Sequence, residues 1–213
     1  MPDDQPTAAT QEASTKPQPP PDDWTPTERI SWFPVLAEAD LDPRVIELIN
    51  RQREKLGAPN NVVRVHSWRP DLMLRWLDLY DHITRGPSGL SRIDREMIAV
   101  VVSAENRCLL CQANHSADLR RLTQDPVLSD RIALDYRRAG LDARTRAMLD
   151  YAIKITRTPI DCEESDITAL QEHGFSIEDV YDIINTAAIY NFNNRVASAG
   201  GFLPDSANHG LYR

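Results

Sequence analysis

Apolar side chains recur at helical spacing along most of this 213-residue chain, and that spacing limits the folds open to it. Two sets of four residues stand at positions i, i+3, i+4 and i+7: Met73, Trp76, Leu77 and Tyr80, and Ile177, Val180, Tyr181 and Ile184. This spacing places each set on one face of a helix. We therefore predict an all-α fold.

Capping signals divide the pattern into successive helices. Helix starts are predicted at residues that suit an N-cap: Asp42, Ser91, Asp125, Asp142, Asp161 and Ser176. Three of them form a capping-box pattern with an acid three residues later: Ser91 with Asp94, Asp161 with Glu164, and Ser176 with Asp179. Glycines predict helix ends at Gly57, Gly86, Gly140 and Gly200-Gly201.

Two short runs stand out from the amphipathic pattern. Met97–Ala104 is apolar almost all round and is expected to form the most buried helix. Asn61–Val65 reads as a strand, because valines dominate it. A single run of this length cannot make a sheet, so the prediction of an all-α fold stands.

Residues 1–26 differ in composition from the rest of the chain. They hold seven of the fifteen prolines and five acids against the single base Lys16. A segment with so little apolar surface cannot offset the entropy lost on ordering. We predict a disordered, Pro-rich, acidic extension over residues 1–26 and a single all-helical domain over residues 27–213.

The charge balance narrows the classes of partner. With 24 basic and 32 acidic side chains, the formal net charge is −8. This disfavours binding to nucleic acid or to an anionic membrane surface, since both need basic residues. The polar, acidic N-terminus lacks the basic start and apolar segment of a signal peptide. We expect a soluble, cytoplasmic protein.

Cysteine is scarce, and two of the three cysteines lie close together in the sequence. Cys108 and Cys111 are separated by two residues, whereas Cys162 has no such neighbour. Such a pair can close a disulfide across one helical turn, and at a helix N-terminus the backbone N–H groups favour thiolate. We expect Cys162 to be a small, partly buried thiol.

Two further residues extend the cysteine pair toward catalysis. His115 follows Cys111 by four residues, so the two share a helix face, and its imidazole can take up or relay a proton. Glu96 lies in the apolar run before the cysteines, where a carboxylate needs a partner, and a histidine from the next helix is the natural one. Glu105, three residues before Cys108, is a competing acid.

Other interpretations of the same residues remain open at this point. The two cysteines can be ordinary core residues. A structural zinc site would use both thiols, His115 and a carboxylate, but such sites usually take a second cysteine or histidine pair. We therefore expect no metal and no cofactor.

Three polar positions outside the motif are harder to interpret. We expect His66 to hydrogen-bond a loop rather than line a cavity. Arg195 is expected to pair with an acid at a helix or subunit contact. Asn193 and Asn194 have no evident task.

The spacing Glu-x11-Cys-x2-Cys-x3-His resembles the alkylhydroperoxidase D-like branch of the carboxymuconolactone decarboxylase superfamily. The likeness covers roughly residues 30–205 and is to the peroxidase-related members. It extends to four blocks that occur in the same order: residues 61–70, 90–104, 148–156 and 192–197.

The resemblance implies a helical fold that assembles into homo-oligomers, and a thiol-dependent peroxidase activity without metal or haem. It assigns Cys111 as the thiolate that attacks peroxide and Cys108 as the resolving cysteine. His115 and Glu96 would form the proton relay. Better characterised relatives carry a histidine or tyrosine between the cysteines, where this chain has Leu109-Leu110.

The predicted function is that of a thiol-dependent hydroperoxidase. Its partners would be a peroxide substrate and an unknown dithiol reductant protein that restores the cysteine pair. Two alternatives on the same fold are a decarboxylase or lactone-processing enzyme and a non-catalytic, redox-sensing oligomer. Decarboxylation needs no redox dithiol, so the cysteine pair disfavours the first of these.

Overall fold

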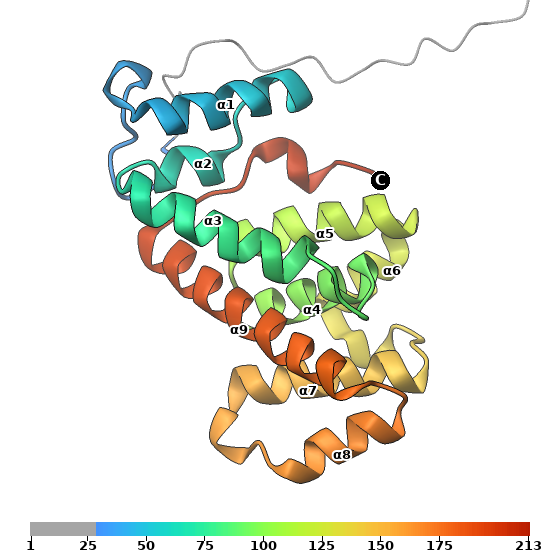
Figure 1. The fold of residues 1–213 in the computed structure, drawn as a ribbon. Helices are drawn as coiled ribbons and strands as arrows, with labels where there is room; N and C mark the ends of the chain where they lie inside the picture. Colours follow the sequence, from blue (N-terminus) through green and yellow to red (C-terminus); the bar gives the residue numbers. More distant parts are fainter. Residues whose placement is uncertain (1–28) are drawn as a thin grey trace, which may run out of the picture.

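The computed structural model describes residues 29–213, and its regular structure there is entirely helical, which confirms the all-α prediction (Figure 1). The α-helices are α1 Pro43–Leu56, α2 Asn61–His66, α3 Pro70–Arg85, α4 Arg92–Glu105, α5 Leu109–Thr123, α6 Pro126–Asp135, α7 Ala143–Arg157, α8 Glu164–Glu172 and α9 Ile177–Gly200. Short 3-10 helices are η1 Glu38–Asp40, η2 Tyr136–Arg138, η3 Pro159–Asp161 and η4 Ser206–His209. The predicted extension over residues 1–26 lies outside the described residues.

Most helix ends follow the capping signals. The carboxylates of Asp42, Asp125 and Asp142 accept hydrogen bonds from backbone N–H groups in the first turns of α1, α6 and α7. Complete capping boxes open α4 and α9, formed by Ser91 with Asp94 and by Ser176 with Asp179. Gly201 caps the C-terminal end of α9, and its φ of 63° suits a residue without a Cβ.

The strand-like run of residues 61–65 is a helix, so that prediction was wrong. The side chain of Asn60 accepts a hydrogen bond from the N–H of Val63 and opens α2. In this helix Val63 and Val65 are buried, which outweighs the preference of valine for strands.

The capping box predicted at Asp161 was also wrong. Asp161 ends η3, a short turn that begins with Pro159. α8 has Glu163 at its N-cap, and the backbone N–H of Glu163 donates to the Asp166 carboxylate at 2.8 Å. The proline turn therefore moves the helix start two positions along the chain.

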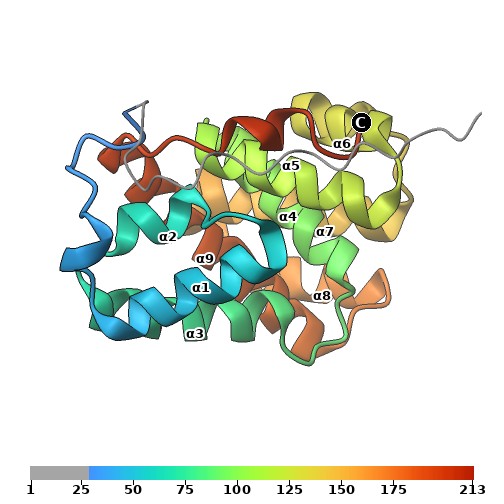
Figure 2. The same cartoon turned by 90° about the horizontal axis from the view of Figure 1, so that it is seen from above.

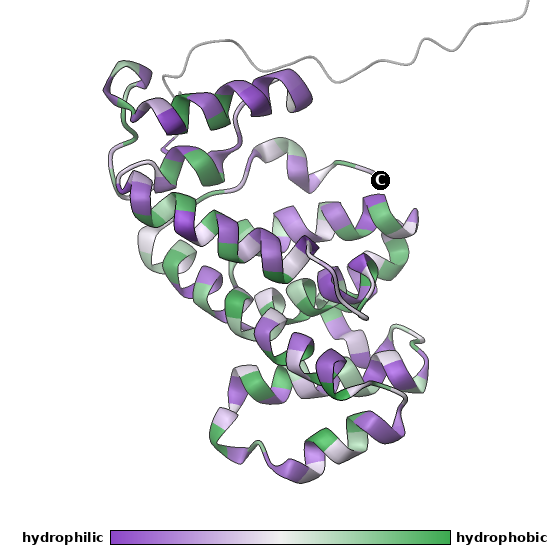
Figure 3. Ribbon diagram, in the orientation of Figure 1, coloured by the Kyte–Doolittle hydropathy of each residue, from purple (hydrophilic) through white to green (hydrophobic). Residues whose placement is uncertain are grey.

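α4 occupies the centre of the molecule. It packs against α5, α7 and α9, and every residue from Arg95 to Ser103 is buried, which confirms the expectation for the apolar run. The outer helices α1 and α3 instead show polar and apolar residues alternating along their length (Figure 3), as expected for helices with one buried face.

A small apolar cluster lies where several distant segments meet. Its buried members come from the segment before α1, from α2, from the start of α5, and from the end of α9 and the residues after it: Ile30, Val65, Cys108, Leu110, Cys111, Ala197 and Phe202. Backbone hydrogen bonds from Trp32 to Gly200 and from Leu203 to Ile30 fix the chain there. The cysteine pair is thus held between parts of the chain that are remote in sequence.

The segment after α9 runs back over α5 (Figures 1 and 2). The buried guanidinium of Arg120, on α5, donates to the carbonyls of Asn208 at 2.8 Å and Leu211 at 2.7 Å. Asn208 also donates to the side chain of Asn114 at 2.7 Å. In the described part of the chain, no helix is both long and apolar enough to cross a membrane.

Candidate active site

The turn between α4 and α5 places both motif cysteines at a helix N-terminus. Arg107 adopts a left-handed backbone conformation, with a φ of 53°, and redirects the chain after α4. Cys108 is then the N-cap residue of α5, and Cys111 is its third residue. Both are buried, with 1% and 6% of their surface exposed.

Cys108 and Cys111 lie 2.9 Å apart. The pKa values of their two thiols are shifted in opposite directions. The thiol of Cys111 donates a hydrogen bond that lowers the pKa of Cys108 to about 6, and the hydroxyl of Ser198 acts in the same direction. The same hydrogen bond, together with burial, raises the pKa of Cys111. The pair therefore gives up its first proton easily and its second with difficulty.

Asn194 is a site residue to which the sequence analysis gave no role. It is 1% exposed, and its side chain hydrogen-bonds Cys111 in the sense that lowers the pKa of that thiol. Its amide also donates to Ser103 at 3.1 Å and accepts from Asn106 at 2.9 Å. One signal was available: Asn194 stands four residues after Tyr190 on the buried face of α9.

Glu96 and His115 form the buried pair that their positions predicted. Nδ1 of His115 lies 2.8 Å from Oε2 of Glu96, and Arg92 donates to Oε1 at 3.3 Å. Burial opposes both charges, but the attraction within the pair prevails. It raises the pKa of His115 and lowers that of Glu96. Since Nδ1 is engaged with Glu96, Nε2 is the nitrogen that can exchange a proton with a substrate.

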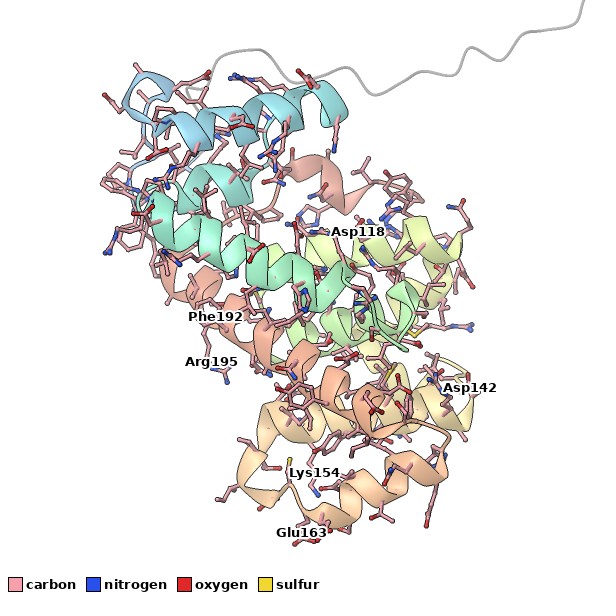
Figure 4. All side chains as sticks on the ribbon, viewed as in Figure 1. Asp118, Asp142, Lys154, Glu163, Phe192 and Arg195 are labelled. Atoms are coloured by element: carbon pink, nitrogen blue, oxygen red, sulfur yellow. The ribbon has the colours of Figure 1, made fainter. Side chains whose placement is uncertain are left out.

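Cys111 and His115 line the same cavity, whose volume is about 460 Å³. Its wall also includes Tyr80 and Arg85 from α3 and Asp118 from α5. Figure 4 labels Asp118, which lies beside α3. The cavity can therefore present a small polar group to a thiol and an imidazole at once.

Groups able to ligate a metal lie together at one point in this region. Ligand atoms of Glu96, His115 and Asp118 fall within 4.8 Å of one another, and neither motif thiol belongs to the cluster. Among the described residues, the arrangement thus differs from the zinc alternative, which required both thiols.

Glu105 is placed away from the relay. It pairs with Arg157 through two contacts of 2.6 Å, so this carboxylate already has a partner. Cys162 is half-buried, as its position predicted.

His66 is not placed as expected. His66 lies in α2, lines the cavity of Cys111 and stacks on Trp76 with ring centroids 4.6 Å apart; burial lowers its pKa to about 4. Arg195 donates to the backbone and side chain of Asn191, and its pairing with an acid at a subunit contact stays a prediction. Figure 4 shows it pointing away from the bundle. Asn193 accepts a hydrogen bond from Trp76 at 2.8 Å.

The chain is similar to known proteins over most of its length. The chain matches the Carboxymuconolactone decarboxylase family model over residues 70–127. It is 36% identical to an uncharacterized peroxidase-related protein from Silicibacter sp. TM1040, with a TM-score of 0.84 over 90% of this chain and 100% of that one. No curated protein matches the chain significantly.

Two further solved structures extend the comparison. An alkylhydroperoxidase AhpD core from Ralstonia eutropha JMP134, also an uncharacterized peroxidase-related protein, is 34% identical, with a TM-score of 0.84 over 87% of this chain and 98% of that one. Debrominase Bmp8 is 18% identical, with a TM-score of 0.69 over 86% of this chain and 95% of that one, and shares the fold. From the match over the whole length of the Silicibacter protein, we conclude that this chain belongs to the peroxidase-related branch of the carboxymuconolactone decarboxylase and alkylhydroperoxidase D superfamily.

Proposed function

We propose that this protein is a thiol-dependent hydroperoxidase that uses Cys108 and Cys111 as a redox dithiol. The observation that carries the proposal is the placement of His115. Held by Glu96, it lines the same cavity as Cys111. A nucleophile and a proton donor facing one cavity are what cleavage of an O–O bond requires.

The first step needs a thiolate at Cys111, whereas the pair favours the thiolate at Cys108. Transfer of the Cys111 proton to Cys108, across the hydrogen bond between them, supplies it. The Cys111 thiolate then attacks the terminal peroxide oxygen. An S–O bond forms, the O–O bond breaks, and the departing alkoxide takes a proton from His115. The products are an alcohol and a Cys111 sulfenic acid.

The second step closes the disulfide. The sulfur of Cys108 attacks that of Cys111, the S–O bond breaks, and the oxygen leaves as water after gaining a proton. An external dithiol returns two electrons and two protons and is itself oxidised to a disulfide. No metal or cofactor is needed in this sequence of steps.

The proposal is tested by mixing reduced protein with one equivalent of an organic hydroperoxide and counting thiols. We expect two thiols to be lost per chain, with one alcohol formed, while Cys162 stays reduced. Cys111→Ser should abolish peroxide consumption, and Cys162→Ser serves as the matched control. Retention of both motif thiols, or undiminished consumption by Cys111→Ser, would rule the proposal out.

Turnover separates this proposal from the two alternatives. A peroxidase consumes many equivalents of peroxide when a dithiol donor is supplied. Disulfide formation without turnover on any dithiol would support a redox-sensing protein instead. Decarboxylation by a variant lacking both motif cysteines would support the decarboxylase alternative.

A further inference from the structure

The two cysteines of the motif line different cavities. Cys111 lines the cavity of about 460 Å³ that it shares with His115. Cys108 lines a second one of about 370 Å³, bounded by Arg29, Trp32, Arg107 and Leu109. A disulfide between the cysteines would therefore have each sulfur open to its own cavity.

The separation of the two cavities matters for thiol–disulfide exchange. The attacking thiolate approaches along the S–S axis, from the side opposite the leaving sulfur. A reductant that enters by the second cavity meets Cys108, and Cys111 leaves as a thiolate. Peroxide and reductant then need not occupy the same space, because each has its own approach.

The rim of the second cavity has the character of a protein-binding surface. Trp32 is 64% exposed and Leu109 is 53% exposed. Trp32 is nevertheless fixed at two points. Its backbone N–H donates to the carbonyl of Gly200 at 2.9 Å. Its indole packs so closely on Gly201 that a Cβ at that glycine would collide with the ring. Rigid exposed aromatic side chains are common anchors in protein interfaces.

The same rim is basic, although the whole chain carries a net charge of −8. The guanidinium of Arg29 donates to the carbonyls of Ser31 and Trp32, which are neutral acceptors. Arg107 lies in the turn between α4 and α5 and directly precedes Cys108 in the sequence. The described lining of this cavity contains no carboxylate. Its charge therefore suits an acidic partner.

The burial of Cys108 limits how such a partner can approach its sulfur. Cys108 is only 1% exposed and lies in the wall of a cavity that has room for a few side chains. A flat protein surface cannot deliver a thiol there. A dithiol on a projecting segment can.

We propose that the reductant is a protein dithiol on a projecting, acidic segment, and that it docks on the rim formed by Arg29, Trp32, Arg107 and Leu109 to attack Cys108. This inference rests on the proposed peroxidase cycle. In the first exchange an S–S bond forms between donor and Cys108, and the bond to Cys111 breaks with release of the Cys111 thiolate. The second donor thiol then displaces Cys108, and the donor leaves as a disulfide.

A trapping experiment tests which sulfur is attacked. The full chain is oxidised chemically with diamide, so the test does not depend on peroxide. The probe is a synthetic peptide with a Cys-x-x-Ser sequence flanked by glutamates, which stops at the mixed disulfide. Peptide mapping by mass spectrometry should find the probe on Cys108. A probe found mainly on Cys111 would overturn the proposal.

A second experiment tests the rim. Two Cys-x-x-Cys peptides, identical except for flanking glutamates or lysines, are used to reduce the oxidised protein at low salt. We expect the acidic peptide to react about tenfold faster, with a difference that shrinks as salt is added. Arg107→Glu should reverse the preference, and Trp32→Ala should slow the acidic peptide.

Matched controls lie away from this cavity. Tyr181 and Arg131 are exposed and do not line it, so Tyr181→Ala and Arg131→Glu should leave both rates unchanged. Small dithiothreitol should reduce all variants equally. Equal rates for the two peptides, or equal effects of the control variants, would refute docking at this rim.

Peroxide oxidation of the reduced variants distinguishes the two proposals. If Trp32→Ala and Arg107→Glu oxidise normally but are reduced slowly by the acidic peptide, both proposals are supported. If no variant, including wild type, is oxidised by peroxide, the peroxidase cycle fails even where the probe is found on Cys108.

Discussion

Asn194 gives Cys111 a hydrogen bond that stabilises its thiolate, in a pair where the other sulfur competes for the charge. The amide is fixed by Ser103 and Asn106, so it cannot turn away when the thiol ionises. A donor held in advance of the reaction stabilises developing charge without reorganising. We therefore propose that Asn194 positions the sulfur of Cys111 for its attack on peroxide.

Replacing Asn194 by aspartate should slow the reaction with peroxide. Asn194→Asp keeps the acceptor for Asn106 but removes the donor to Cys111 and adds negative charge near it. Loss of a hydrogen bond to a charged group costs about 1.5–3 kcal/mol, which corresponds to about 10- to 100-fold in rate. The measurement is peroxide-driven thiol loss between pH 6 and 10, whose rise should move to higher pH. Asn185→Asp, on the same helix, is the control, and an unmoved profile would contradict the role.

The Glu96–His115 pair should make stability depend on pH on both sides of a window. Folding lowers the pKa of Glu96 from its ordinary 4.5, so its contribution is present above that pH and is lost as the pH falls. Folding raises the pKa of His115 from 6.5, so its contribution is present below that pH and is lost as the pH rises through the folded value. The pair stabilises most between these two pH values.

Urea unfolding of wild type and of a Glu96→Gln/His115→Gln variant measures this effect. The difference in unfolding free energy should be largest at about pH 5–6 and decline toward pH 3 and pH 9. A control variant of the exposed pair Arg138–Asp135 should show little change across the same range. A difference that does not vary with pH would contradict an ion pair at this site.

The sequence predicted one half of the site better than the other. A carboxylate at Glu96, inside an apolar helix, demands a partner, and the motif supplies His115 at the right distance along the chain. The bond between them was therefore predictable. Asn194 comes from a helix about 80 residues later in the sequence, and its register against Cys111 is set by packing that no local pattern encodes.

At the scale of helices, α4 is the helix whose side chains are packed most completely on all sides. Ile98 is fully buried within it, whereas Leu79 on α3 is 52% exposed. Ile98→Ala leaves a cavity that its neighbours on α5, α7 and α9 cannot close. We expect the variant to lose about 2–5 kcal/mol of unfolding free energy, measured by urea denaturation. Leu79→Ala should change it by less than about 1 kcal/mol, and equal losses would argue against a central α4.

Helix starts were predictable where one capping residue dominates and less so where turns compete. Ser91 and Ser176 open their helices as expected, because nothing upstream offers another start. Near Asp161, the fixed φ of Pro159 creates a separate turn first. At α2, burial of the valines decided between helix and strand, and burial belongs to the tertiary structure.

On the scale of the whole molecule, exposed apolar side chains gather around a third cavity of about 610 Å³. We name as the aromatic patch its exposed large apolar lining residues: Phe33, Trp68, Leu72 and Phe192, the last labelled in Figure 4. Patches of this kind mark contact surfaces. We propose that the aromatic patch joins copies of this chain in a homo-oligomer.

Light scattering after size-exclusion chromatography tests the assembly. Wild type should have the mass of more than one chain, and Phe192→Asp should shift the mass toward a single chain. Tyr181→Asp changes another exposed aromatic residue on the same helix, outside the patch, and should not alter the mass. Identical masses for wild type and Phe192→Asp would exclude the patch as the contact.

The carbonyls of Asn208 and Leu211 that receive the guanidinium of Arg120 stand 88 and 91 residues later in the sequence. During synthesis on the ribosome, α5 emerges long before these acceptors exist. The guanidinium of Arg120 therefore stays hydrated until the segment after α9 has been made. The contact between Arg120 and the segment after α9 is therefore one of the last that α5 can make as the chain is synthesised.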